Sequence, residues 1–239
     1  MNATLASLAR EGYAMVPDAL GQAELDRLDS AIDTLAPAGD DGIQGGMRDL
    51  FTLLPASREL AAHPAIWCWP SAVLGPKCFA VRAILFDKRP EANWKVAWHQ
   101  DLTIAVRKRL DVPGFGPWSR KAGIPHVQPP TEILERMLAV RVHLDPCGYD
   151  NGRLRVLPGS HLHGKLTPSA IDDWKAGTAA VELPCPAGGL LVMRPLLVHA
   201  SSAAERPGRR RVIHFEFAAD HLPNCLEWRE QWGQAASAA

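Results

Sequence analysis

The sequence lacks any long apolar run. None of its hydrophobic stretches approaches the ~20 apolar residues that a membrane-spanning helix requires. The opening MNATLASLAREGY has no basic stretch followed by an apolar core, the pattern of a secretory signal. We therefore expect a protein that has no membrane partner and is not exported.

Paired cysteines are also missing. The five cysteines are scattered, odd in number and never spaced as Cys-x-x-Cys, which argues against a disulfide framework or a structural zinc site. This usage of cysteine predicts a reducing, cytoplasmic setting.

An excess of charge of one sign is absent as well, since 26 basic residues balance 26 acidic ones. Such a chain produces no long-range field that would gather nucleic acid or an anionic membrane, so a small-molecule ligand is the partner we expect. The 239 residues contain no repeat, no linker and no coiled-coil pattern, which predicts one domain over residues 1–239 and a monomer.

Helical patterns are confined to the first third of the chain. Residues 20–36 place leucines and an isoleucine on one stripe, which predicts an amphipathic helix, and a second helical region is expected over residues 57–74, broken by Pro64.

Short β-prone runs follow from residue 78 and are separated by Gly, Pro, Asn and Asp. They are CFAVRAILFDK, KVAWHQDLTIAV, MLAVRVHLD, GRLRVLP, AAVEL, GGLLVMRPLLVHA and RRVIHFEFA. The order predicts a mainly β fold, a β-sandwich or small barrel with an N-terminal helical cover.

One segment does not fit a simple hairpin. Residues 108–133 hold five prolines and three glycines, and long structured insertions of this kind are often binding loops, so we expect an active-site loop or lid. A surface excursion without a chemical role is the alternative.

A possible metal site begins at His99-Gln100-Asp101. In a strand, residues i and i+2 point to the same face, so a His-x-Asp sequence presents an imidazole and a carboxylate side by side. A second histidine would complete the two-histidine, one-carboxylate face that holds iron(II) with open positions. Nine histidines leave rival pairs, namely His143 with Asp145, His214 with Glu216, and His161 with His163.

Spacing favours the first pair. His199 ends the most apolar run, GGLLVMRPLLVHA, where it could supply the distal ligand. Arg210 follows eleven residues later at the start of another strand run, where an arginine can hold a carboxylate with two hydrogen bonds. The basic cluster around it is equally compatible with a solvated hairpin end.

The order of three motifs, WHQD, NGRLRVLPGSHLHG and LLVHASSAAERPGRRRVIHFEFA, resembles the phytanoyl-CoA dioxygenase family of iron(II)- and 2-oxoglutarate-dependent oxygenases. The opening AREGYAMVPDALGQAELDRLDSAID is similar to the N-terminal strand and helix of that family. The resemblance implies a double-stranded β-helix, also called a jelly roll, with helices on one sheet. It also implies the cofactor iron(II) and the co-substrates 2-oxoglutarate and O2.

By this resemblance His99, Asp101 and His199 match the iron ligands. Arg210 and Ser201 match the groups that hold the distal carboxylate of 2-oxoglutarate. Arg211 remains an alternative to Arg210, because a register slip of one residue exchanges them. Arg82 and Lys88, charged residues in an apolar run, are weaker candidates for contact with a co-substrate or substrate.

The resemblance assigns the rival pairs to structural places and leaves aromatic residues as candidates for the substrate pocket, namely Trp94, Trp98, Phe115 and Trp118. Large aromatics are also common core residues. Related halogenases replace the metal-binding carboxylate with a small residue, so Asp101 favours hydroxylation, desaturation or ring closure.

Two alternatives to the oxygenase stay open. One is a cupin-like metalloenzyme that does not use 2-oxoglutarate, and the other is a non-catalytic small-molecule binding protein on the same fold. The identity of the substrate, including whether it is a CoA thioester, does not follow from the sequence.

Overall fold

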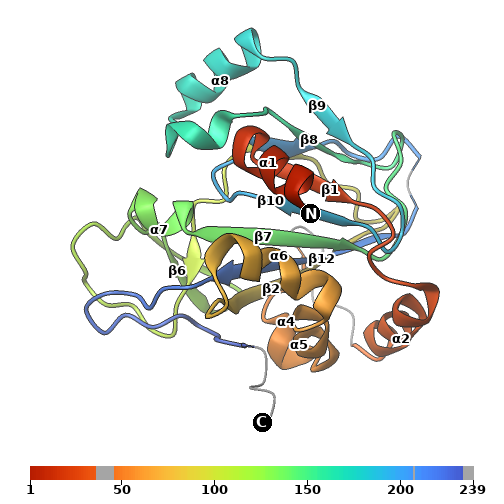
Figure 1. The fold of residues 1–239 in the computed structure, drawn as a ribbon, viewed down its shortest axis with the longest axis horizontal. Helices are drawn as coiled ribbons and strands as arrows, with labels where there is room; N and C mark the ends of the chain where they lie inside the picture. The colour runs from red at the N-terminus through yellow and green to blue at the C-terminus, as the bar shows by residue number, and fades with distance from the viewer. Residues whose placement is uncertain (36–45, 207, 234–239) are drawn as a thin grey trace.

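A computed structural model describes residues 1–35, 46–206 and 208–233 (Figure 1). The described strands form three antiparallel sheets. The largest has the order β1 (Tyr13–Val16), β10 (Leu190–Met193), β7 (Met137–His143), β12 (Arg210–Ala218) and β2 (Phe79–Lys88). The second has the order β3 (Val96–His99), β11 (His199–Ser201), β8 (Leu154–Val156) and β9 (Val181–Leu183).

These two sheets pack face to face. A shared apolar cluster joins Ala139, Leu191 and Met193 of the large sheet to Leu154 and Val156 of the smaller one. The mainly β jelly roll expected from the sequence is therefore confirmed.

Helices cover the outer face of the large sheet (Figure 1). They are α4 (Leu50–Leu53), α5 (Ala56–Ala61) and α6 (Pro64–Leu74). Phe51 of α4 stacks on Phe215 of β12 at 5.9 Å between ring centroids, and Trp67 of α6 meets the edge of Phe217 at 6.0 Å. Aromatic pairs of this kind make the outer face the main apolar core.

Five further helical segments complete the described structure. They are α1 (Asn2–Glu11), α2 (Gln22–Asp33), α7 (Thr131–Glu135), the 3₁₀ turn η1 (Ser160–His163) and α8 (Pro168–Gly177). No helix in the described ranges combines the length and apolar character needed to cross a membrane.

The helix predictions are confirmed in outline. α2 lies within residues 20–36 and buries Leu25, Leu28 and Ile32. The second helical region is divided where expected, because α5 ends at Ala61 and α6 begins at Pro64. Helices α1 and α8 were not predicted. α8 has no fully buried residue, so its apolar stripe is weak.

Two apolar runs that the sequence presents as single strands are each divided between sheets, so those predictions were wrong. The run 95–106 forms β3 and then β4 (Ile104–Ala105) of the third sheet. The run 188–200 forms β10 and then β11, with a turn in which Leu197 donates its N–H to the Arg194 carbonyl. Pro195 interrupts this run because proline has no N–H for a sheet ladder.

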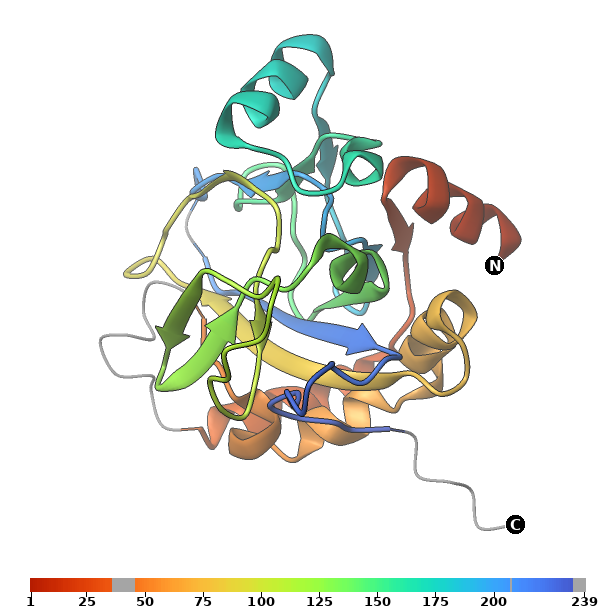
Figure 2. The ribbon, with the colours of Figure 1, turned by 90° about the vertical axis from the view of Figure 1, so that its left-hand side faces the viewer.

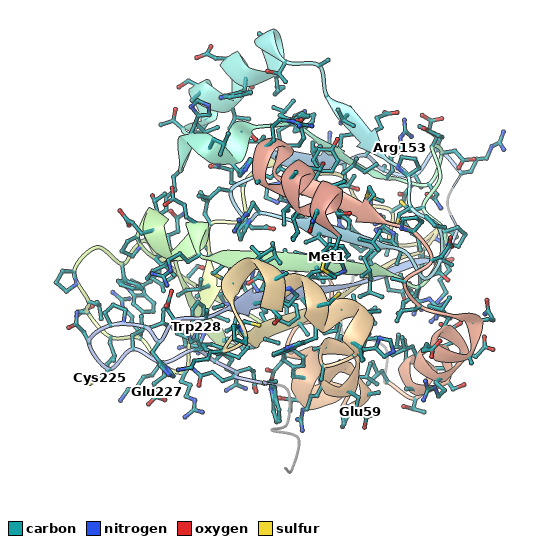
Figure 3. The ribbon with its side chains drawn as sticks, in the orientation of Figure 1. Met1, Glu59, Arg153, Cys225, Glu227 and Trp228 are labelled. Carbon is teal, nitrogen blue, oxygen red and sulfur yellow. The ribbon has the colours of Figure 1, made fainter. Side chains whose placement is uncertain are left out.

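Segment 108–133 is not an irregular loop. It contains the hairpin of β5 (Trp118–Lys121) and β6 (Ile124–Val127), which joins β4 to form the third sheet. Figure 2 views the molecule from the side on which this hairpin lies. A C-terminal segment packs beneath it, where Trp228 is buried and donates from Nε1 to the Asp220 carbonyl at 2.9 Å (Figure 3).

Candidate metal centre and co-substrate site

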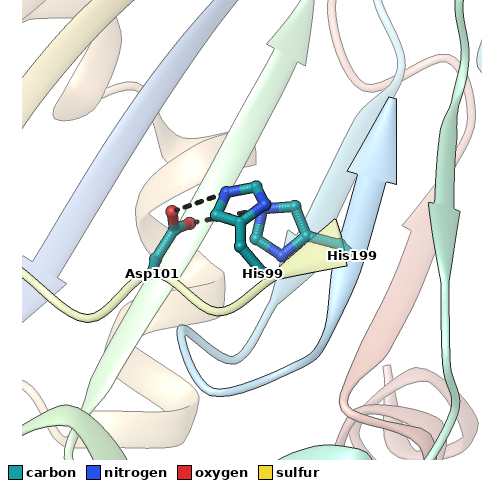
Figure 4. A group of neighbouring side chains, drawn as sticks. All are labelled: His99, Asp101 and His199. Atoms are coloured by element: carbon teal, nitrogen blue, oxygen red, sulfur yellow. Dashed lines mark ion pairs between the residues drawn. The ribbon is translucent and has the colours of Figure 1, made fainter. Parts of the chain in front are cut away.

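Three side chains from two neighbouring strands meet at one point. His99 ends β3 and His199 begins β11, and the antiparallel register places them opposite each other with ring centroids 4.2 Å apart. Asp101 lies just beyond β3, where its N–H donates to the Pro195 carbonyl at 2.9 Å. The chain reversal at Pro195 therefore positions the carboxylate beside both histidines (Figure 4).

The donor atoms of this triad suit a divalent cation. Nε2 of His99 lies 3.6 Å from one carboxylate oxygen of Asp101, and Nε2 of His199 lies 3.7 Å from the other. One ligand atom from each residue lies within 4.8 Å of the others. A set of two imidazoles and one carboxylate on one side of a point is the facial arrangement that iron(II) oxygenases use.

Hydrogen bonds orient both rings for metal binding. Nδ1 of His99 lies 2.8 Å from the Ala97 carbonyl, and Nδ1 of His199 lies 2.8 Å from the Leu197 carbonyl. A carbonyl can only accept, so Nδ1 carries the proton and Nε2 keeps its lone pair. Both free lone pairs point to the same place.

The protonation states also suit a cation. Burial acts to raise the pKa of Asp101, but the two neighbouring histidines hold it well below its usual value. Burial lowers the pKa of His199 to about 4. Burial also disfavours the charged form of His99, but the Asp101 carboxylate raises its pKa overall, so a proton or a metal ion is favoured between these groups.

Gln100 keeps the segment between the ligands in place. Its Nε2 donates to the carbonyls of Gly164 and Leu196 at 2.8 and 2.7 Å, and its Oε1 accepts from the Leu166 N–H at 2.8 Å. This side chain therefore holds the segment by hydrogen bonds and does not belong to the metal triad.

The triad opens into a cavity of about 600 Å³ between the two large sheets. This volume accommodates a small organic ligand together with a co-substrate. Basic side chains dominate its lining. At one end are Lys88, Arg141 and Arg210, and elsewhere are Arg48, Arg82, Lys95 and Lys121. Of the described residues that line it, Asp101 is the one acid.

The phytanoyl-CoA dioxygenase family model matches residues 8–212. The chain belongs to this family. Its members are iron(II)- and 2-oxoglutarate-dependent oxygenases, and the triad supplies their type of ligand set. This member is accordingly a non-haem iron oxygenase that uses iron, 2-oxoglutarate and O2.

Solved structures of similar fold support the architecture. EctD from S. alaskensis, solved with 2-oxoglutarate and 5-hydroxyectoine, gives a TM-score of 0.70 at 19% identity over 92% of this chain and 76% of its own. The carbocyclase SnoK from nogalamycin biosynthesis gives 0.68 at 17% identity over 91% and 83%. The epimerase SnoN, in complex with Fe³⁺, alpha ketoglutarate and nogalamycin RO, gives 0.67 at 18% identity over 99% and 96%.

At these identities the likeness concerns the fold. No curated protein matches the sequence of this family member.

The structure separates the two neighbouring arginines that the sequence left as alternatives. Arg210 is buried, lines the cavity and donates to the Gly152 carbonyl at 3.1 Å. Arg211 points to the opposite face, where it binds both carboxylate oxygens of Asp145 and reaches Asp29 of α2. Arg211 therefore has a structural role, and Arg210 is the arginine available to a ligand in the cavity.

Ser201 and Lys88 lie beside Arg210. The Ser201 hydroxyl donates to the Gly152 carbonyl at 2.8 Å and accepts from Lys88 Nζ at 3.1 Å. Burial lowers the pKa of Lys88 to about 8, and the positive charge of Arg210 acts in the same direction. Lys88 and Arg210 thus place two adjacent buried cations at one end of the cavity.

Arg82 lies elsewhere in the cavity, paired with Glu216. Glu216 also contacts His214, whose other ring nitrogen lies 3.3 Å from Arg141. His214 lines the cavity. Together with Glu216 it links Arg82 and Arg141 in a hydrogen-bonded chain. It does not join the metal triad.

The other rival histidines, His143, His161 and His163, do not join the metal triad. His143 is buried, while Asp145 holds Arg211. His161 is buried beneath α1, with Nε2 at 3.2 Å from the Ala9 carbonyl.

The aromatic residues proposed for the substrate pocket occupy other places. Phe115 and Trp118 pack against the apolar cluster around Trp228, and Trp98 lies beneath Arg155 at 5.3 Å. None of these three lines the 600 Å³ cavity, whereas Trp94 does, with Lys88 Nζ 5.6 Å from its ring centroid. Trp118 does not reach the cavity because its side chain on β5 turns toward the apolar cluster around Trp228.

Sequence reasoning missed four basic residues of the cavity lining, namely Arg48, Lys95, Lys121 and Arg141. Arg141 carried a signal, since it is a lone charge in the apolar run MLAVRVH. Arg48 and Lys121 lie in polar surroundings of the sequence and have no such signal.

Proposed function

We propose that the protein binds iron(II) through His99, Asp101 and His199 and oxidises an unactivated carbon of a small organic molecule. The observation that carries this proposal is the triad itself: two free Nε2 lone pairs face one ionised carboxylate at the wall of a large cavity. Iron(II) with 2-oxoglutarate supplies an oxidant that can remove a hydrogen atom from such a carbon, with release of succinate and CO2.

Arg210 and Ser201 hold the distal carboxylate of 2-oxoglutarate in this proposal, with Lys88 as a neighbouring cation. A guanidinium binds a carboxylate through two parallel hydrogen bonds, and a buried site strengthens them. The Arg210 Nε has no partner among the described residues, so a donor remains for the ligand. The Gly152 carbonyl orients both Arg210 and Ser201.

The remaining groups orient the substrate and exclude water from the reacting carbon. The retained Asp101 fills the position that chloride would need, which favours hydroxylation, desaturation or ring closure over halogenation. Segment 108–133 contributes Lys121 and Gln128 to the cavity lining, which supports a role as the substrate-covering wall. Free thiols at all five cysteines support a cytoplasmic setting, and the lack of a coiled-coil pattern in the sequence supports a monomer.

The first test is anaerobic addition of iron(II) and 2-oxoglutarate. The wild type should develop the weak visible absorption of the iron chelate, and Asp101→Ala should abolish it. Asp111→Ala is the matched control, because Asp111 lies in the same chain region with an almost fully exposed side chain. A folded wild type that binds iron but never develops the band would exclude the proposal.

Arg210→Met separates the oxygenase from a cupin-like metalloenzyme. In the oxygenase this variant should retain iron while its affinity for 2-oxoglutarate falls at least tenfold, because a charge-assisted pair is lost. Activity that is indifferent to both Arg210 and 2-oxoglutarate would favour the other metalloenzyme. Failure to retain iron in the wild type would favour a binding protein.

A further inference from the structure

The cavity has two cationic ends, although the whole chain is neutral. Lys88 and Arg210 face each other across the β2–β12 pair, and Arg82 and Glu216 face each other farther along the same pair. Lys88 lies six positions after Arg82 on β2. At ~3.3 Å per residue, the distance along the strand between them is about 20 Å. Ile84 and Phe86 line the floor between them.

The second end holds a cluster of three cations, defined by Arg48, Arg82 and Lys121. Arg48 follows the N-terminal helices in sequence, Arg82 lies on β2, and Lys121 lies on the hairpin of the third sheet. Burial lowers the pKa of Arg48 and of Lys121, and the nearby charge of Arg82 lowers both further. All three side chains line the large cavity, so cations from three separate segments meet there.

Few carboxylates pair with the cations of this cluster. Glu216 pairs with Arg82, and Lys121 Nζ has the Thr103 hydroxyl at 3.2 Å. Asp49, next to Arg48 in sequence, is paired with Arg229 and lines a small cavity of about 20 Å³ that Arg48 and Arg82 also line. Within the described residues, Glu216 is therefore the one carboxylate partner found for three cations that line the large cavity.

The metal triad lines the same cavity as both cationic ends. Burial and neighbouring cations lower the pKa of Lys121 and Arg141, while the Asp101 carboxylate acts in the opposite direction on both. Asp101 is thus close to a cation of each end. A five-carbon diacid that is bound to the metal by one end extends toward one cationic end only, which leaves the other without an anion.

We propose that the prime substrate is an organic anion whose carboxylate or phosphate binds to the cluster of Arg48, Arg82 and Lys121. This inference rests on the proposed function, since it assigns 2-oxoglutarate to Arg210. The bound anion compensates the charges of Arg48 and Lys121, which have no carboxylate partner among the described residues, and holds the rest of the substrate over the floor of Ile84 and Phe86, beside the metal triad.

The test uses anion probes on the protein loaded anaerobically with iron(II) and saturating 2-oxoglutarate. Phenylphosphonate and phenylacetate are the anionic probes, and 2-phenylethanol is their neutral counterpart. Both anions should bind and perturb the visible chelate band, and the alcohol should not. Lys121→Met and Arg48→Met should each weaken anion binding at least tenfold, because a charge-assisted contact is lost.

Arg120→Met is the matched control. Arg120 precedes Lys121 on the same strand, is exposed, and donates to the Gly123 carbonyl at 2.6 Å. This variant should bind the anions as the wild type does. The chelate band in each variant reports that the protein is folded and holds iron and 2-oxoglutarate.

Equal binding of the anions and the alcohol, or undiminished anion binding by both cluster variants, would overturn the inference. A phenylphosphonate preference over phenylacetate would identify a phosphate-bearing substrate, and the reverse a carboxylate. If the wild type forms no chelate, the proposed function fails, while calorimetric titration of the metal-free protein with the same probes still decides whether the cluster binds anions.

Discussion

The two faces of strands β2, β7 and β12 both bury side chains but are chemically opposite. The outer face carries Phe215, Phe217, Val140 and Leu85, which pack beneath the helices as the main core. The inner face carries buried charged or titratable groups, namely Lys88, Arg141, Arg210, His214 and Glu216. One strand such as β12 alternates between the two at every residue.

Burial therefore has opposite effects on the free energy of folding on the two faces. On the outer face it removes apolar surface from water and stabilises the fold. On the inner face it removes charges from water, which opposes folding unless partners compensate. Uncompensated buried charge is expected at a functional site, where a ligand supplies the missing partner.

The largest effect should come from truncating the outer face. Phe215→Ala removes a fully buried ring that stacks on Phe51, so the free energy of unfolding should fall by about 4 kcal/mol. Phe86→Ala is the matched change on the inner face, where the ring is only partly buried and borders the cavity. Urea unfolding should show a clearly smaller loss for Phe86→Ala, and equal losses would contradict the distinction.

The neighbouring arginines provide a second comparison of intermediate size. Arg211→Met should lower the free energy of unfolding by about 3 kcal/mol, because it leaves the Asp145 carboxylate without its two-point partner. Its affinity for 2-oxoglutarate should match the wild type, whereas Arg210→Met should lose that affinity. Urea unfolding and titration of the iron chelate measure the two properties, and exchanged phenotypes would refute the assignment.

Lys88→Met should have the smallest effect, and a stabilising one. Burial lowers the pKa of Lys88 from 10.5 to about 8, so the folded protein binds this proton less tightly than the unfolded chain does. The resulting penalty is complete below pH 8 and disappears as pH rises from about 8 to about 10.5.

Without metal, the free energy of unfolding of Lys88→Met should therefore exceed that of the wild type by about 1 kcal/mol at pH 7. This figure includes the loss of the hydrogen bonds from Lys88 to Ser201 and Ser202. This advantage should shrink toward pH 10 in paired urea unfolding experiments. A difference that does not depend on pH would show that Lys88 is not the titrating group.

Local pattern was sufficient for much of the fold. The stripe of Leu25, Leu28 and Ile32 and the break at Pro64 depend on neighbouring residues, so the sequence predicted both helical regions. Strand alternation likewise predicted β2, β7 and β12. The run from 188 to 200 was wrongly predicted as one strand because its apolar character continues through a turn. Its two halves join different sheets, and their strand partners are distant in the chain.

The sequence by itself determined which residue types exist for the metal chemistry: a His-x-Asp pair, a later histidine and an arginine eleven residues beyond it. The tertiary structure decided how they act. The His99–His199 register, the side chain direction that separates Arg210 from Arg211, and the meeting of Arg48, Arg82 and Lys121 all depend on contacts between distant segments. The neutral composition does not predict a cationic cavity, because net charge contains no information on where the charges lie. The potential that acts on a ligand depends on which charged side chains the fold brings together.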